Sequence, residues 1–156
     1  MRMELITGAS NHPAVRRLQE FFSAMHEWER EMLREGNIDF GHLSEAESAA
    51  ARARQNNALR ASLGRIFETC CEAGWNAKRV KDALHCGGRE PVYDPVRERI
   101  TSVRETADRV IIETEQTHEL GAQFKYELVM VQGQWMLRDN RKGRIPGRKN
   151  WRPWDL

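Results

Sequence analysis

The stretch from Gln123 to Asn140 reads QFKYELVMVQGQWMLRDN, and its pattern decides the fold class. In its first half, every second residue from Phe124 to Met130 is large and apolar. This period of two is the pattern of a β-strand that buries one face. Gln132-Gly133 interrupts the pattern before it resumes at Trp135. A break of two residues that includes a glycine predicts a tight hairpin, so we expect two antiparallel strands here.

Two further strands are expected on the N-terminal side of this hairpin. Residues 97–104 alternate in a way that would place Ile100 and Val103 on opposite faces. Residues 108–117 combine a β-branched run with a strict Glu/Thr alternation. The connections between successive strands are short, and short connections force antiparallel pairing. Residues 91–140 therefore predict a meander of four antiparallel strands.

The period of the apolar residues is helical before Pro91. A first helix is expected to begin near Ser10 or Asn11, with Pro13 in its first turn, and to end at Gly36. Apolar residues then recur at steps of three and four, which makes one buried stripe. Its members are Val15, Leu18, Phe21, Phe22, Met25, Trp28, Met32 and Leu33.

A second helix is expected to open at Ser44, because Ser44 and Glu47 form a capping-box pattern. It continues through a segment rich in Ala, Arg, Glu and Leu as far as Cys71. Its predicted buried stripe consists of Leu59, Leu63, Ile66, Phe67 and Cys70. A short third helix is expected over residues 76–85.

These elements predict one α+β domain over residues 1–156, in which helices cover one face of a curved sheet. Residues 1–90 form the helical half, 91–140 the antiparallel four-stranded sheet, and 141–156 a basic C-terminal tail. From Arg138 onward there are seven basic and two acidic residues, whereas the residues before it are slightly acidic overall. Two tryptophans in the tail argue that part of it docks.

The composition also limits where the protein works. Three cysteines, two of them adjacent, make a poor disulfide framework, so we expect a reducing compartment. No apolar run approaches the length of a membrane span, and residues 1–10 lack the pattern of a secretory signal. The expected location is the cytoplasm, without a membrane partner.

The chain resembles a known family in both architecture and local sequence. Helices followed by a curved meander are similar to the nuclear transport factor 2-like fold, a cone-shaped α+β domain. Within that fold, five segments look like its immunity proteins. They are Val92–Pro95, the positions Glu98, Ile100 and Val103, and then Arg109–Thr114, Phe124–Val129 and Gly133–Asp139.

The resemblance implies an immunity protein, an antitoxin encoded beside a polymorphic toxin such as those of Rhs-type and contact-dependent systems. Such a protein binds the cognate toxin domain and neutralises it by occlusion, without catalysis. We therefore expect no catalytic residue, no cofactor and no metal.

Other functions remain open from the residues alone. An enzyme of this fold would hold acids, histidines and tyrosines inside the cone, and the candidates are His26, Glu29, Asp94, Asp139 and Tyr126. A deep polar cavity would favour catalysis or small-molecule binding, and a cone plugged by aromatic side chains would oppose them. The thiols and imidazole of Cys70-Cys71 and His85-Cys86 lack the spacing of a zinc site.

The basic tail supports two kinds of partner. Basic residues mixed with tryptophans suit phosphate contact and base stacking, so nucleic-acid binding is the alternative. Trp and Arg also dominate protein interfaces. For the toxin-binding surface we predict Glu113, Glu115, Arg144, Arg148, Trp151 and Trp154.

Overall fold

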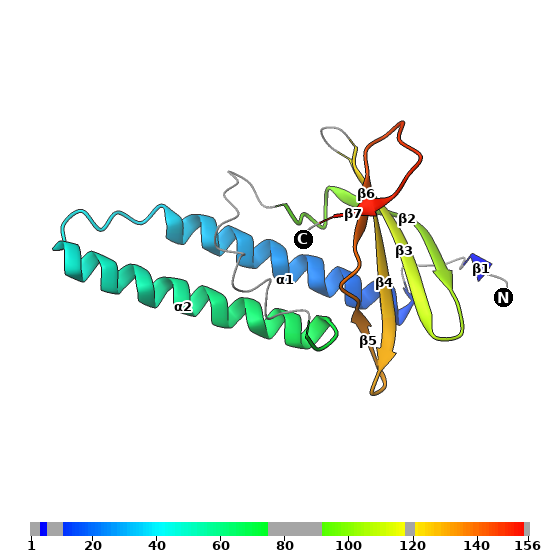
Figure 1. Cartoon of the computed structure of the whole chain (residues 1–156), viewed down its shortest axis with the longest axis horizontal. Helices are drawn as coiled ribbons and strands as arrows, with labels where there is room; N and C mark the ends of the chain where they lie inside the picture. Colours follow the sequence, from blue (N-terminus) through cyan, green and yellow to red (C-terminus); the bar gives the residue numbers. More distant parts are fainter. Residues whose placement is uncertain (1–3, 6–10, 75–91, 118–120, 155–156) are drawn as a thin grey trace.

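The computed structural model describes residues 4–5, 11–74, 92–117 and 121–154, which form two long helices followed by an antiparallel sheet (Figure 1). The helices are α1 (Pro13–Gly36) and α2 (Glu45–Cys70). The strands are β1 (Glu4–Leu5), β2 (Glu98–Glu105), β3 (Arg109–Gln116), β4 (Gln123–Val131), β5 (Gln134–Leu137), β6 (Lys142–Arg144) and β7 (Arg152–Pro153). The third helix predicted over residues 76–85 lies outside the described residues.

Helix α1 begins slightly later than the sequence predicts. The N-cap is His12 rather than Ser10 or Asn11, because the His12 side chain accepts a hydrogen bond from the backbone N–H of Ala14 (3.0 Å). Pro13 occupies the first turn as expected. The helix ends at Gly36, also as expected.

Helix α2 begins at the predicted capping box. The Glu47 N–H donates to Ser44 Oγ (3.2 Å), and the Ser44 N–H donates to the Glu47 carboxylate (3.0 Å). At the other end Cys71 leaves the helix and forms a parallel bridge with Leu137 of β5. The next N–H, that of Glu72, donates to the Leu137 carbonyl (2.9 Å). The C-terminal end of α2 is thereby joined to the sheet.

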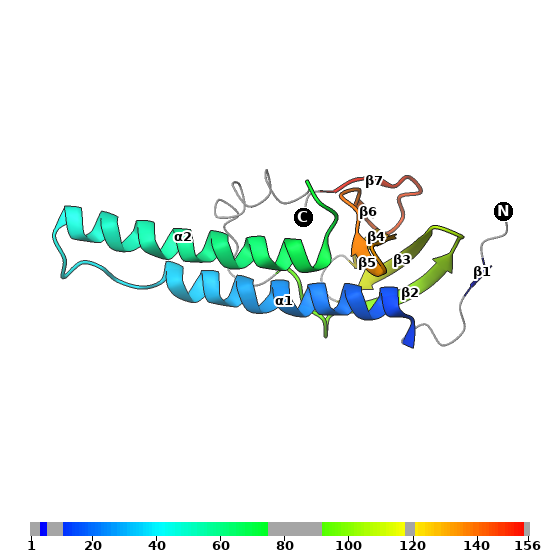
Figure 2. The same cartoon turned by 90° about the horizontal axis from the view of Figure 1, so that it is seen from below.

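The two helices pack side by side, and their far ends extend away from the sheet (Figures 1 and 2). The buried stripes match the predicted ones, apart from Met32, Leu33 and Ile66, which are only partly buried. Trp28 binds the two helices together by donating its indole N–H to the Leu59 carbonyl (2.9 Å). No described helix is both long and apolar enough to cross a membrane.

The four predicted strands are confirmed as β2 to β5, but the described sheet is wider, with seven strands. Strand β1 pairs with β2 at one edge, and β6 and β7 extend the other. The residues predicted only as a basic C-terminal tail therefore form β-structure in part. Strands β5 and β6 pair with successive halves of the same edge of β4. Residues 138–141 form the step between them.

One predicted strand pattern is wrong because of a β-bulge. The register shifts between Ile100, which pairs with Thr114, and Ser102, which pairs with Glu113. The extra residue, Thr101, turns the remainder of β2 over by one position. Val103 consequently faces the core with Ile100, instead of lying on the opposite face.

The core lies between the helices and the inner face of the sheet. Strands β3 and β4 bury alternate residues there, and α1 contributes its aromatic stripe. Phe21 and Phe22 surround Tyr93, with ring centroids 5.5 and 5.7 Å from that of the tyrosine. Trp135 is partly buried at the edge of this core, where its carbonyl accepts from Arg17 Nε (3.0 Å).

Candidate functional site

The predicted contact residues of β3 lie on the outer face of the sheet, the face turned away from the core. Val110, Ile112 and Thr114 are buried, so the intervening Glu113 and Glu115 point outward. Both carboxylates have cationic neighbours. Glu113 accepts from Arg104 and lies 3.5 Å from Lys125 Nζ. Glu115 accepts from Arg99 at 2.9 Å.

Trp151 continues this row of charges toward the C-terminus. Lys125 Nζ lies 4.4 Å from the centroid of the Trp151 ring, and Arg144 Cζ lies 4.2 Å from that centroid. Arg144 also donates from Nε to Gln123 Oε1 (2.6 Å), and Gln123 is the cross-strand neighbour of Glu115. The structure therefore brings Glu113, Glu115, Arg144 and Trp151 into one connected surface.

The other two predicted residues lie apart from this row. Trp154 lies against Gly143, and its ring meets Phe124 edge-to-face at 5.6 Å. Because Phe124 faces the core, Trp154 covers the end of the core, with 39% of its surface exposed. Arg148 is exposed on the loop between β6 and β7. We call residues 142–154, which contain both strands and this loop, the basic arm.

Arg141 is a residue whose role the sequence did not indicate. It was counted with the tail, yet it is 5% exposed and lies in the core. Its guanidinium lies over three rings, 4.0 Å from the centroid of Phe124 and 5.4 Å from those of Tyr93 and Tyr126. These distances are within the range of cation–π attraction. A charged side chain of this chain thus fills the space between the helices and the sheet.

Buried hydroxyl groups accompany Arg141. The Tyr93 hydroxyl accepts from Arg141 at 3.4 Å, and the Tyr126 hydroxyl donates to Glu98 at 3.2 Å. Burial raises the pKa of both tyrosines above the ordinary value for a phenol, although the positive charge of Arg141 opposes this rise. Both phenols therefore stay protonated at neutral pH.

Two of the residues considered as catalytic candidates hold the backbone of Tyr93. His26 Nδ1 is 2.6 Å from the Tyr93 carbonyl, and the Tyr93 N–H donates to Glu29 Oε2 (3.1 Å). Burial raises the pKa of Glu29, and the backbone hydrogen bonds of Tyr93 and Val92 partly oppose this. The hydrogen bonds fix the chain where it approaches β2. The carboxylate of Asp94 similarly caps a turn by accepting from the Val96 N–H (2.9 Å).

Two cavities border the buried residues. A groove of about 440 Å³ runs between α1 and α2 and includes Glu20, Glu27, Arg65 and Ile66 in its lining. A second cavity of about 360 Å³ lies between α1 and β2. Neither lining includes His26, Glu29 or Asp94, so neither combines the predicted acid–base candidates.

Cys70 and Cys71 are free thiols buried at the end of α2. Burial raises the pKa of both groups, which disfavours the thiolate form that binds metals. Within the described parts of the chain, no three His, Cys, Asp or Glu side chains gather as a metal site. His85 and Cys86, the other two residues weighed as zinc ligands, lie outside those parts.

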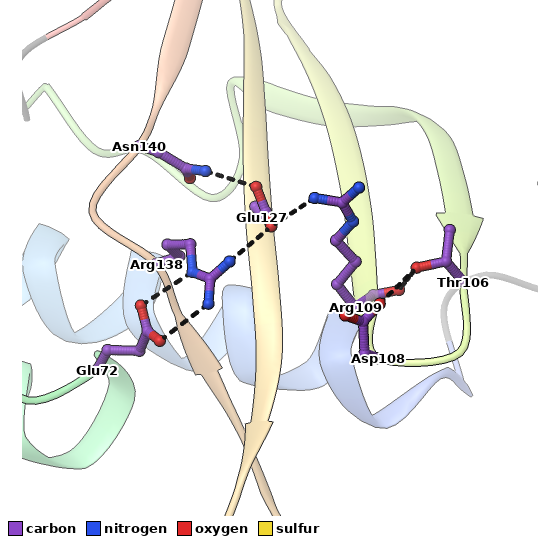
Figure 3. Close-up of polar contacts among 7 residues, drawn as sticks. All are labelled: Glu72, Thr106, Asp108, Arg109, Glu127, Arg138 and Asn140. Atoms are coloured by element: carbon purple, nitrogen blue, oxygen red, sulfur yellow. Dashed lines mark hydrogen bonds and ion pairs between the residues drawn. The ribbon is translucent and has the colours of Figure 1, made fainter.

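A second polar network joins α2 to the outer face of the sheet (Figure 3). Glu127 accepts from Arg109 and from Arg138, each at 3.2 Å, and also from Asn140. Arg138 donates in addition to both carboxylate oxygens of Glu72, at 3.2 and 3.4 Å. Burial alone would raise the pKa of Glu127, but these hydrogen bonds and charges outweigh it and lower the pKa.

Comparison with known families matches this architecture. The family model described as NTF2 fold immunity protein matches residues 14–153. The chain belongs to the family of NTF2 fold immunity proteins. Neither the curated proteins nor the solved structures contain a significant match to the chain.

The extent of the match bears on the C-terminal residues. It includes α2, strands β2 to β7, all but the first residue of α1 and nearly all of the basic arm. In this NTF2 fold immunity protein, the arm is therefore continuous with the family domain and contributes two strands to its sheet. The alternation from Phe124 to Met130 predicts in part the charges on the outer face, because it places Lys125 and Glu127 together on the opposite strand face. The pairing register was the missing information.

Proposed function

We propose that this chain binds the toxin domain of a cognate effector and neutralises it. The toxin would belong to a polymorphic toxin system, such as an Rhs-type or contact-dependent system. The immunity protein would act in the cytoplasm and protect the cell during bacterial competition. The observation that carries the proposal is membership of the NTF2 fold immunity proteins, with a match that extends over residues 14–153.

We infer that neutralisation proceeds by occlusion, without chemistry. The position of Arg141 supports this inference, because its guanidinium and the surrounding rings fill the buried space beside Tyr93 and Tyr126. The hydrogen bonds of His26 and Glu29 are made to the backbone of Tyr93, which gives both side chains a structural role. Covering an active site or a substrate path needs only a stable complex.

The proposed contact surface is the outer face of the sheet together with the basic arm. Four of its residues are connected through Lys125 and Gln123, and Arg148 and Trp154 extend it along the arm. Such a surface offers charges for orientation and aromatic groups for affinity. The proposed members are Glu113, Glu115, Arg144, Arg148, Trp151 and Trp154.

The test is co-expression with the toxic product of the adjacent gene. We expect growth to be rescued and a one-to-one complex to be recovered. In vitro, toxin activity should fall linearly with added immunity protein and vanish at equimolar ratio. Full inactivation by a small fraction of one equivalent would indicate catalysis and overturn the occlusion mechanism. Absence of rescue and of any complex would overturn the antitoxin function itself.

A further inference from the structure

We propose that the basic arm binds an acidic patch on the surface of the toxin domain. This inference rests on the proposed antitoxin function and specifies the chemistry of the partner. It starts from the sequence of the arm, which contains five basic residues and no acidic residue. These are Lys142, Arg144, Arg148, Lys149 and Arg152.

The positive charge of the arm is available at the surface. Four of its five basic residues are exposed, and Arg144 is partly exposed. Among the residues that the structure describes, none of the five lies within ion-pair distance of a carboxylate. Their charges are therefore not neutralised by the described part of the sheet.

The acidic residues nearby do not offset this charge toward a partner. On the outer face, Glu113 is held by Arg104 and Lys125, and Glu115 by Arg99. Glu127 is held by two arginines and an amide. Each of these carboxylates already has a cation beside it, so its field is largely cancelled. The unbalanced charge of this surface is positive, and a partner with the opposite sign is favoured.

The aromatic residues of the arm favour a protein partner over a nucleic acid. Base stacking needs an open aromatic face. Trp151 already has two cations over its ring, and Trp154 lies with its ring against Gly143. The exposed large apolar side chains of the arm are Ile145 and Trp154, with 43% and 39% of their surfaces accessible. An aliphatic side chain among cations suits a protein surface with acidic groups.

The arm is also held in place before any partner binds. Strand β6 pairs with β4 and β7 pairs with β6, while the Trp154 N–H donates to the Arg141 carbonyl (3.0 Å). Arg141 itself is anchored in the core. A surface that is already ordered loses less conformational entropy on binding. Less of the favourable interaction energy is therefore offset by the cost of ordering the arm.

The experiment compares two charge-matched double variants. Arg148→Gln with Lys149→Gln removes two positive charges from the loop of the arm. Arg16→Gln with Arg54→Gln removes two from exposed positions on α1 and α2. Binding to the toxin domain recovered by co-expression is measured by surface plasmon resonance over a series of salt concentrations.

The arm variant is expected to bind about five- to tenfold more weakly, mainly through a slower association rate, and to show a shallower salt dependence. The control variant should stay within about twofold of the wild type, because its charges lie on the helices and not on the arm. Equal losses in both variants would reduce the effect to net charge and overturn the inference. An arm variant with unchanged affinity would also overturn it while leaving the antitoxin function intact.

A second measurement tests for binding to nucleic acid. A labelled single-stranded RNA of about 20 nucleotides is titrated against the wild type and against the immunity–toxin complex. We expect weak binding that the arm variant does not change. Tight RNA binding that is lost in the arm variant would assign the arm to nucleic acid and overturn the inference. If no toxin complex forms at all, the proposed function fails and this inference fails with it.

Discussion

Replacing Gly143 with alanine is expected to detach Trp154 from the sheet. A Cβ atom at position 143 would lie 2.6 Å from Trp154 Cε3 and 2.8 Å from Cδ2. Carbon atoms do not approach this closely, so the ring must move. Gly143 is paired on both sides in the middle of β6 and cannot shift easily, whereas the Trp154 side chain is partly exposed and has room to move. The indole is therefore the group that will be displaced.

The cost follows from what the ring loses. About three-fifths of Trp154 is buried, since 39% of its surface is exposed. For a tryptophan this corresponds to about 150 Å², or about 4 kcal/mol at 25 cal/mol per Å². The displaced ring recovers part of this burial elsewhere. We expect Gly143→Ala to lower the free energy of unfolding by about 2–4 kcal/mol, and Trp154→Ala to lower it by a similar amount.

A double-mutant cycle measured by urea denaturation checks the mechanism. In the Trp154→Ala background the obstacle is absent, and Gly143→Ala should be neutral or stabilising by about 0.4–1 kcal/mol. The two substitutions should thus be strongly non-additive. If Gly143→Ala costs the same in both backgrounds, contact with Trp154 is not the reason for glycine at this position and the reasoning is refuted.

Two other substitutions test the polar groups. Arg141→Ala should lower the free energy of unfolding by about 3–5 kcal/mol. Arg141→Met should lower it by less, because methionine refills the space between the rings. Equal losses of the two variants in urea denaturation would contradict the role assigned to the side-chain volume. Glu127→Gln should flatten the acid limb of the stability curve. The folded-state pKa of Glu127 lies below its ordinary value of 4.5, so its carboxylate stabilises the fold above that pH. This contribution is lost as the pH falls through the folded-state pKa. A steeper acid limb in the variant would contradict this sign.

The elements that could be predicted are those with a local signal. The capping box at Ser44 and Glu47 needs only neighbouring residues, and it marks the start of α2 correctly. The turn at Gln132-Gly133 is similarly local, and both residues have positive φ, as a tight hairpin requires. Periodicity over eight or more residues likewise identified α1 and the long strands.

The features that were missed depend on long-range pairing. The bulge at Thr101 is created by the register between β2 and β3, and alternation in β2 alone gives no sign of it. Strands β6 and β7 contain three and two residues, too few for a period to appear. They form because an edge of β4 remains open beyond β5 and the chain returns to it. The β4–β6 pairs join residues 17 to 21 positions apart, from Lys125↔Lys142 to Gln123↔Arg144, so no short window of sequence contains both partners.

The same limit applies to the charge of the C-terminal residues, which the sequence presents as one basic tail. The fold divides it into cations with different surroundings. Arg138 is bound to Glu72 and Glu127, and Arg141 lies among aromatic rings, so both serve the fold. The basic residues of the arm, by contrast, form no ion pair with a described carboxylate. Substitutions at Arg138 or Arg141 will therefore report on stability, and a loss of binding in such variants says nothing about the interface. The charge pair Arg148 and Lys149 separates the two effects, because removing it leaves every described contact of the core and the sheet in place.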